Sequence, residues 1–160
     1  MRVARTIVWA VVLVFALGMV DAISAATLTK EELKTAYMKL LQEEGYSPIA
    51  EDNGQVVDVV FKHEGGIYFI RLYPNDQEFF QLVYPNYWKI KSEAEMKKAL
   101  AAADYSNATS KVAKTQIISS NIWSTVELLI ISPDQVKPIL KRALSTLQQG
   151  VYNFTQKMRE

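Results

Sequence analysis

The sequence predicts an α+β fold, an antiparallel sheet with packed helices in the order α-β-β-β-α-β-β-α. Three observations lead to this prediction. Hairpin-turn signals occur in two blocks, at residues 49–90 and 111–131. Apolar stripes at helical spacing precede, separate and follow these blocks. Each helical segment also opens with a capping sequence, which marks where extended chain gives way to helix.

The first helix is expected between Thr29 and Gly45. Thr29 and Glu32 form a capping box, in which the two side chains satisfy free backbone N–H groups at the helix start. Gly45 is suited to end the helix, because glycine adopts the left-handed conformation common just after a helix C-terminus. The apolar stripe between them consists of Leu33, Ala36, Tyr37, Leu40 and Leu41.

The first sheet block consists of extended segments divided by turn residues. The segments are Ile49–Glu51, Val56–Lys62, Ile67–Tyr73 and Glu78–Tyr84. The turns are Asn53-Gly54, Glu64-Gly65-Gly66 and Pro74-Asn75-Asp76, and Pro85-Asn86 ends the block. Val56–Lys62 is rich in β-branched residues, and its one acid, Asp58, is expected to face water.

The second half of the chain begins with an alanine-rich helix. Ser92 and Glu95 form its capping box, and its stripe fades near Ser106-Asn107. Two strands follow, Lys111–Ile118 and Ile122–Ile131, joined by a hairpin turn at Ser119-Ser120-Asn121.

The last helix has the clearest start signal in the chain. In Ser132-Pro133-Asp134-Gln135, the serine is the predicted N-cap, the proline takes the first helical position and the glutamine closes the box. Gly150 interrupts the helix at a cost of up to about 1 kcal/mol relative to alanine, which indicates a bend or a close contact. The apolar stripe is Val136, Leu140, Ala143, Leu144, Leu147, Val151, Phe154 and Met158.

Residues 1–26 have the layout of a secretory signal peptide. Arg2 and Arg5 precede an apolar run of 14 residues, Ile7–Val20. Because a signal-peptide core needs about 7–15 apolar residues and a membrane span about 20, cleavage is favoured over anchoring. Cleavage after Ala22, Ala25 or Ala26 fits the small residues that follow. The expectation is an exported protein, periplasmic or secreted, with a single domain at residues 27–160 and no stable membrane anchor.

Composition narrows the classes of partner and chemistry. The chain has 18 Lys+Arg and 17 Asp+Glu, and removing the leader with Arg2, Arg5 and Asp21 leaves 16 of each. A neutral mature chain argues against nucleic-acid binding and against a polybasic membrane-surface module. The absence of cysteine excludes disulfides, thiol nucleophiles and Cys-ligated zinc, and suits a bacterial periplasm.

Several segments carry a resemblance to a known family. They are Tyr68-Phe69-Ile70-Arg71-Leu72, Glu78-Phe79-Phe80-Gln81-Leu82, Ala99–Asn107, Lys111-Val112-Ala113-Lys114, Trp123–Leu128 and Ser132-Pro133-Asp134-Gln135 before Leu140–Leu144. Their order resembles the YbjN-like family of putative bacterial sensory-transduction regulators, which is similar in fold to type III secretion chaperones. The resemblance implies a binding domain, with a homodimer as one option, and brings no catalytic residues. Type III chaperones are cytosolic, so an export signal departs from that role.

Four aromatic residues are the candidate binding residues: Tyr84, Tyr87, Trp88 and Phe154. The first three flank Pro85 between sheet and helix, where aromatics either anchor a partner or cover the sheet as core. Phe154 lies beyond Gly150, where the helix is longer than one sheet face needs. The stripe there is expected to be exposed and to form an interface.

The function expected from these features is a non-enzymatic binding module, chaperone-like or regulatory, that holds an unknown protein or peptide partner. The alternative is a small-ligand-binding protein or weak hydrolase that uses His63 and nearby carboxylates. His63, Glu64 and Asp58 could be drawn as a metal site, but one histidine on a hairpin is more often solvated. No metal, cofactor or catalytic residue is therefore predicted.

Overall fold

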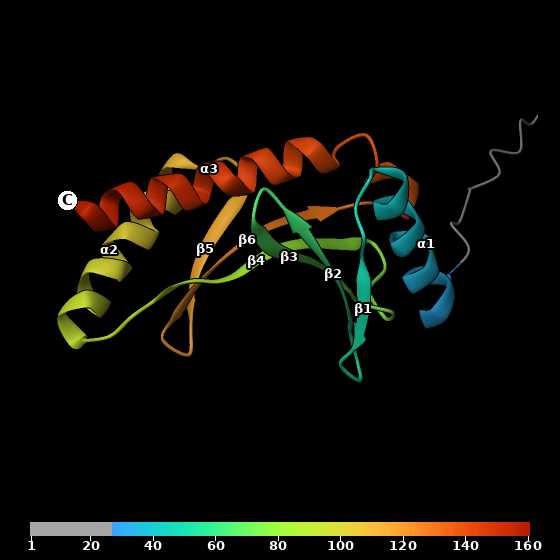
Figure 1. Cartoon of the computed structure of the whole chain (residues 1–160), viewed down its shortest axis with the longest axis horizontal. Coiled ribbons are helices and arrows are strands. Elements are labelled where there is room, and N and C mark those ends of the chain that lie inside the picture. Colours follow the sequence, from blue (N-terminus) through green and yellow to red (C-terminus); the bar gives the residue numbers. More distant parts are fainter. Residues whose placement is uncertain (1–26) are drawn as a thin grey trace, which may run out of the picture.

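The computed structural model describes residues 27–160 and confirms the α+β fold, an antiparallel sheet with helices packed on it. The predicted leader, residues 1–26, lies outside the described residues. The sheet has six strands in the order β1-β2-β3-β4-β6-β5, and all neighbours are antiparallel. The elements are α1 (Lys30–Glu43), β1 (Ile49–Asp52), β2 (Val57–His63), β3 (Gly66–Leu72), β4 (Phe79–Lys89), α2 (Glu93–Thr109), β5 (Ala113–Ile118), β6 (Asn121–Leu129), a 3₁₀ turn η1 (Pro133–Gln135) and α3 (Leu140–Arg159) (Figure 1).

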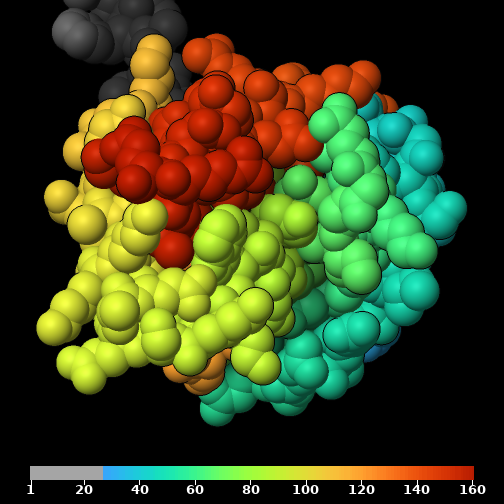
Figure 2. Space-filling model, turned by 60° about the vertical axis from the view of Figure 1, so that its left-hand side comes forward, coloured from blue at the N-terminus to red at the C-terminus, as the bar shows by residue number. Residues whose placement is uncertain are grey.

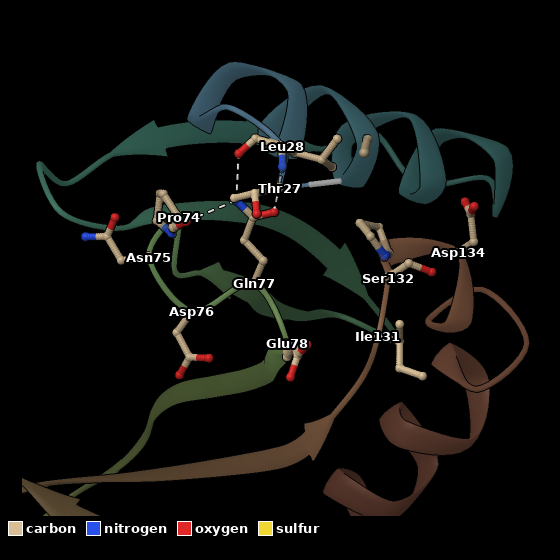
Figure 3. A pocket seen from close by; sticks show the side chains of 12 residues that line it. Thr27, Leu28, Pro74, Asn75, Asp76, Gln77, Glu78, Ile131, Ser132 and Asp134 are labelled. Carbon is tan, nitrogen blue, oxygen red and sulfur yellow. Dashed lines mark hydrogen bonds between the residues drawn. The ribbon is translucent and has the colours of Figure 1, made fainter. Parts of the chain in front are cut away.

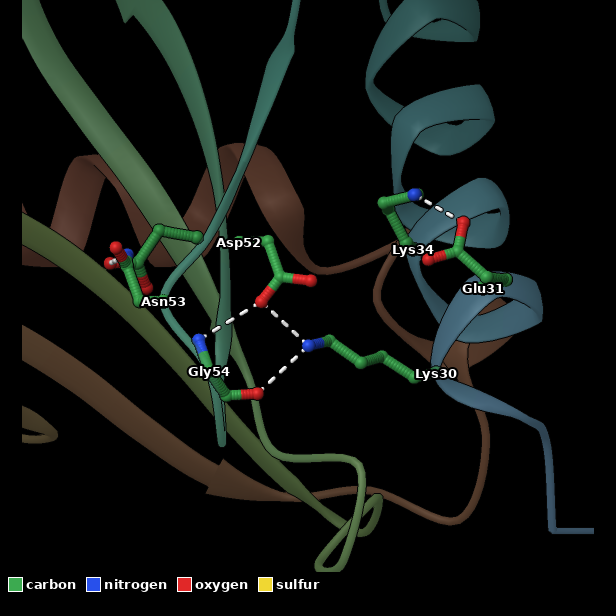
Figure 4. A network of polar contacts seen from close by, with 7 residues as sticks. Lys30, Glu31, Lys34, Asp52, Asn53 and Gly54 are labelled. Atoms are coloured by element: carbon green, nitrogen blue, oxygen red, sulfur yellow. Dashed lines mark hydrogen bonds and ion pairs between the residues drawn. The ribbon is translucent and has the colours of Figure 1, made fainter.

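The first block contributes one strand more than the predicted order. The short segment before the Asn53-Gly54 turn is strand β1, which pairs with β2 over four register positions from Ile49↔Val60 to Asp52↔Val57. Lys30 at the start of α1 fixes this hairpin, because its Nζ donates to Asp52 Oδ1 at 2.6 Å and to the Gly54 carbonyl at 2.8 Å (Figure 4).

Strand β4 does not end at Pro85-Asn86 as predicted, but continues to Lys89 through a bulge. The register with β6 shifts between Tyr84↔Ser124 and Trp88↔Ile122. Asn86 adopts φ +53°, a left-handed conformation that asparagine tolerates better than most residues. Turn-forming residues therefore bend the strand here instead of ending it, since β6 continues to pair beyond them.

The last helix starts later than predicted. The Ser132 side chain makes no cap hydrogen bond, and Pro133–Gln135 form a 3₁₀ turn in which Gln135 Oε1 accepts from the Ile131 N–H at 2.8 Å. Helix α3 begins only at Leu140. Pro138 explains the delay, because a proline inside a helix started at Pro133 would lack the N–H needed for its hydrogen bond.

Helices α1, α2 and α3 pack on the same face of the sheet, and the sheet arches beneath them, with the β1–β2 and β5–β6 turns pointing away from α3 (Figure 1). The larger core cluster joins α1 and the first half of α3 to the central strands. A smaller cluster joins α2 and the end of α3 around Phe154. The predicted Thr29–Glu32 capping box is present. Within residues 27–160, no helix has the length and apolar character needed to cross a membrane.

Gly150 marks a close contact, one of the two options that the sequence left open. A Cβ built at this position would lie 3.0 Å from the Cβ of Ala113 on β5. The Gly150 carbonyl also accepts a hydrogen bond from Ser106 Oγ of α2 at 2.9 Å. The glycine therefore lets α3 approach both α2 and the edge of the sheet.

Asn107 of α2 covers the outer edge of β5. Its Oδ1 accepts from the Thr115 N–H at 2.7 Å and its Nδ2 donates to the Thr115 carbonyl at 3.2 Å. The side-chain amide thus takes the place that a neighbouring strand would occupy, which protects an edge strand from pairing with another chain.

Candidate binding surface

The candidate site is the face of the sheet opposite the helices, called here the open face. Strand residues alternate between faces, so the register assigns each side chain to one of them. Phe61, Ile70 and Leu82 point to the helices and are buried in the larger core cluster. The open face carries Ile49, Glu51, Asp58, Val60, Lys62, Ile67, Phe69, Arg71, Phe79, Gln81, Val83, Lys89, Lys114, Gln116, Ile118, Asn121, Trp123, Thr125, Glu127 and Leu129.

A row of polar side chains crosses one half of the open face. Asp58, Arg71, Gln81 and Glu127 lie directly opposite one another on β2, β3, β4 and β6. Arg71 donates to Asp58 from Nε and Nη2, both at 2.8 Å, and Gln81 donates to Glu127 at 3.1 Å. Asp58 is therefore buried and ion-paired, which corrects the expectation that it faces water. Its burial is possible because the planar guanidinium satisfies both carboxylate oxygens.

The charges of this row are already compensated within the protein. Hydrogen bonding to Asp58 raises the pKa of Arg71. Burial acts to raise the pKa of Glu127, but hydrogen bonds from Lys114 and Gln81 outweigh it and leave that pKa below its usual value. Because each charge of the row has a partner on the same face, the row is structurally fixed and itself offers little net charge to a ligand.

The other half of the open face is apolar and basic. Ile67 and Ile118 are 54% and 40% exposed, and half-buried Trp123 lies between their strands. The Trp123 ring meets Phe69 edge-on at 6.0 Å, and its Nε1 donates to Asn86 Oδ1 at 2.9 Å. Two exposed lysines, Lys62 and Lys89, lie on the same half, and neither forms an ion pair with any residue that the structure describes.

A split between β3 and β4 opens into this apolar half. Only three register pairs join the strands, and the last is Phe69↔Val83. The next residue of β3 with its backbone turned toward β4 is Ile67, which would lie opposite Pro85. Since proline has no N–H to donate, the ladder stops there. Figure 2 shows the surface hollowed where the green β2–β3 hairpin and the yellow-green end of β4 diverge.

The predicted residues Tyr84 and Tyr87 line the helix side of this split. Tyr84 stacks on Tyr68 with ring centroids 4.5 Å apart and on Tyr87 at 5.3 Å. Trp88 turns toward α2, where its Nε1 donates to Glu95 Oε1 at 2.9 Å. Tyr84 faces the helices by ordinary strand alternation with Phe80 and Leu82, and the bulge after it allows Tyr87 to lie on the same side as Trp88. The three side chains therefore lie on the helix side of the split and form no part of the open face.

Tyr87 also ends a chain of buried hydroxyl groups. Its OH lies 3.0 Å from Ser124 Oγ, which is 3.1 Å from Thr115 Oγ1, which is 3.0 Å from Ser106 Oγ. The Gly150 carbonyl can only accept, so Ser106 donates to it and accepts from Thr115. By the same reasoning Thr115 accepts from Ser124, and Ser124 accepts from the Tyr87 hydroxyl. Burial raises the pKa of Tyr87 to about 12.

Phe154 is a core residue, which overturns the expectation of an exposed strip beyond Gly150. Its side chain is 0% exposed, and Met158 is buried in the same cluster. The rings of Tyr87 and Trp88 meet Phe154 edge-on at 5.7 and 6.1 Å. The helix is not too long for the domain, because α2 lies beneath its last turns and provides the additional packing surface.

His63 has a packed environment in place of the solvated one expected. Its Nδ1 lies 3.0 Å from the Tyr46 hydroxyl, and its ring meets Tyr46 and Tyr68 edge-on at 5.8 Å. Glu64 Oε1 is 3.9 Å from Nε2, but Asp58 lies on the opposite face with Arg71. Over residues 27–160, no three His, Cys, Asp or Glu side chains gather in a way that could hold a metal ion.

A pocket of about 760 Å³ lies between the start of α1, the β3–β4 turn and the segment after β6 (Figure 3). Gln77 builds one wall, since its side chain bonds the Leu28 N–H at 3.0 Å, the Leu28 carbonyl at 2.6 Å and the Pro74 carbonyl at 3.0 Å. Asp76, Glu78 and Asp134 also line the pocket. From the sequence, Asp76 was assigned to a turn and Glu78 to the start of a strand. Their position in one pocket with Asp134 was not predicted.

Comparison with known proteins shows the fold and nothing finer. No protein-family model matches the chain, and no curated protein matches it in sequence. An uncharacterised protein from Methanothermobacter thermautotrophicus, known from a crystal structure, is similar with a TM-score of 0.53 at 11% sequence identity. The match covers 79% of this chain and 99% of the archaeal one.

Proposed function

We propose that this protein is an exported, non-enzymatic binding module, related to the YbjN-like family, that holds a segment of a partner protein on the open face of its sheet. The observation that carries the proposal is the arrangement of the sheet, with α1, α2 and α3 on one face and exposed isoleucines beside a half-buried tryptophan on the other. Tryptophan and large apolar residues are typical anchors in protein interfaces.

The two halves of the open face support a binding role in different ways. The paired charges of Asp58 and Arg71 hold one half rigid, which limits the conformational entropy that a partner must overcome. The half around Trp123 exposes apolar surface, which gains free energy when it is removed from water. A partner is therefore expected to anchor on the half with Ile67 and Ile118 and to meet a preformed surface.

Site-specific photocrosslinking in the native cells tests this proposal. Benzoylphenylalanine replaces Ile118 on the open face or, as a matched control, Tyr152, which is 57% exposed on α3 on the helix side. The proposal predicts one reproducible protein adduct from position 118, none from position 152, and recovery of the adduct in the exported fraction. Adducts only from position 152, or none from either, would refute binding at the open face, and a cytoplasmic adduct would refute export.

A further inference from the structure

Two exposed isoleucines of the open face each have a lysine beside them. Lys62 of β2 lies directly across from Ile67 of β3. Lys89 of β4 and Ile118 of β5 both lie opposite Asn121 of β6, so they flank one residue on the same face. Both lysines are exposed, and neither forms an ion pair with a residue in the described part of the chain. The two positive charges are therefore available to a partner that binds beside the isoleucines.

The acids of the open face leave these lysines uncompensated. Asp58 and Glu127 are already bound to other bases of the same face. Glu51 lies opposite Asp58, which is four residues before Lys62 on β2, so Glu51 and Lys62 are separated by about 13 Å along the strands. Positive charge beside exposed isoleucine is complementary to a partner that presents carboxylates and apolar side chains from the same side.

A segment bound on the face of a sheet has to pair its own backbone groups. The hydrogen bonds of a sheet run sideways from strand to strand, so the face offers no backbone partner. Backbone groups that are buried against Ile67 and Trp123 must still be paired, and a helix pairs them internally. Helices α1, α2 and α3 meet the same requirement on the other face. Strand addition along β5, beside Ile118, would displace Asn107 from the Thr115 backbone.

We infer that the partner segment is an amphipathic helix with carboxylates beside its apolar stripe. The stripe lies over Ile67, Trp123 and Ile118, and the carboxylates reach Lys62 and Lys89. This inference rests on the proposed function and names its ligand class. Residues three or four apart project from the same side of a helix, so one helix presents both kinds of side chain to this face. Three apolar contacts and two exposed ion pairs give weak, reversible binding.

The test uses a blocked helical peptide of about five turns, with leucines in one stripe, glutamates on both sides of it and alanine elsewhere. The peptide is titrated into the isotope-labelled protein and followed by NMR shifts. The expected shifts centre on Ile67, Ile118 and the indole of Trp123, with none at Tyr152 on the helix side. The same peptide with lysine for glutamate should not bind. A peptide with two central prolines keeps the leucines and the charges but not the helix, and it should not bind either.

Charge-reversed protein variants test the same contacts from the other side. Lys62→Glu with Lys89→Glu should weaken the acidic peptide about fivefold or more and should allow the lysine peptide to bind. Lys97→Glu with Lys98→Glu is the matched control, because both lysines are exposed on α2 and the change in net charge is the same. The control should bind the acidic peptide as the unaltered protein does. Circular dichroism checks that both variants are folded.

Several outcomes would overturn the inference. These are equal binding of the proline peptide, binding of the lysine peptide to the unaltered protein, an equal loss in the α2 control, or no binding of the acidic peptide. Self-association through this face, seen by light scattering and abolished by Ile67→Glu, would make a second copy the occupant. Binding to phosphatidylglycerol vesicles instead of the peptide would make the basic half a lipid surface. If crosslinking at position 118 still captures a protein while the acidic peptide fails, the proposed function stands and the helix inference falls.

Discussion

Truncation of Phe154 is the perturbation that best tests whether the end of α3 belongs to the core or to an interface. The side chain is 0% exposed and lies in one core cluster with Ala99 of α2, Ile122 of β6 and Ile90, the residue after β4. Phe154→Ala removes most of a buried aromatic ring from a site where the surrounding backbone can collapse only partly. The expected loss in free energy of unfolding is about 3–5 kcal/mol. For a domain of this size, that corresponds to a fall in melting temperature of about 10–20 °C.

The measurement is urea and thermal unfolding followed by far-UV circular dichroism, with light scattering to record the oligomeric state. Tyr152→Ala is the matched control, because Tyr152 is on the same helix but 57% exposed. Its effect should stay within about 0.5 kcal/mol. A loss below about 1 kcal/mol for Phe154→Ala, or a changed oligomeric state with an unchanged melting temperature, would refute the core assignment and restore the interface interpretation.

Two further predictions concern contacts around the end of α3. Gly150→Ala should destabilise the fold by about 1–2 kcal/mol despite the better helix propensity of alanine, since the new Cβ would lie 3.0 Å from that of Ala113. Chemical denaturation should show recovery when Ala113→Gly is added, and no recovery would refute the steric reason. Tyr87 has a folded pKa of about 12 against about 10 unfolded, so its neutral form stabilises the fold fully below pH 10. That contribution should be lost as pH rises from 10 to 12, and a denaturation midpoint equally alkali-sensitive in Tyr87→Phe would contradict this.

The fold class was predictable because its signals are local. The Thr29–Glu32 capping box and the Asn53-Gly54 turn act through neighbouring residues, and the structure has both as predicted. The course of β4 was not predictable in the same way. Pro85 and Asn86 are ordinary strand-ending residues, and only the continued pairing of β6 with Trp88 carries the strand past them. Tertiary pairing here overrides local propensity.

The predicted binding aromatics lie on the helix face of the sheet, opposite the face that we propose for binding. Tyr84 faces the helices by the alternation of β4, and the bulge after it, which no sequence pattern specifies, places Tyr87 on that side as well. Phe154 was misplaced because the stripe of α3 was judged against the sheet alone, without α2 beneath it. Asp58 and Arg71 lie 13 residues apart, and only the register of β2 and β3 brings them together. The sequence offered one signal for this ion pair, because an acid and a base stand at interior positions of two neighbouring predicted strands.

The unequal edges of the sheet limit how copies of this protein can assemble. Asn107 occupies the backbone of β5 at Thr115, so another chain cannot add a strand there without displacing it. The opposite edge, β1, has four residues, and within residues 27–160 no side chain is hydrogen-bonded to its outer backbone. Growth of a fibre by strand addition needs two competent edges on every copy. Because the β5 edge is closed, strand pairing can join two copies only through their β1 edges. The resulting pair has no open edge left, so strand addition stops at two copies.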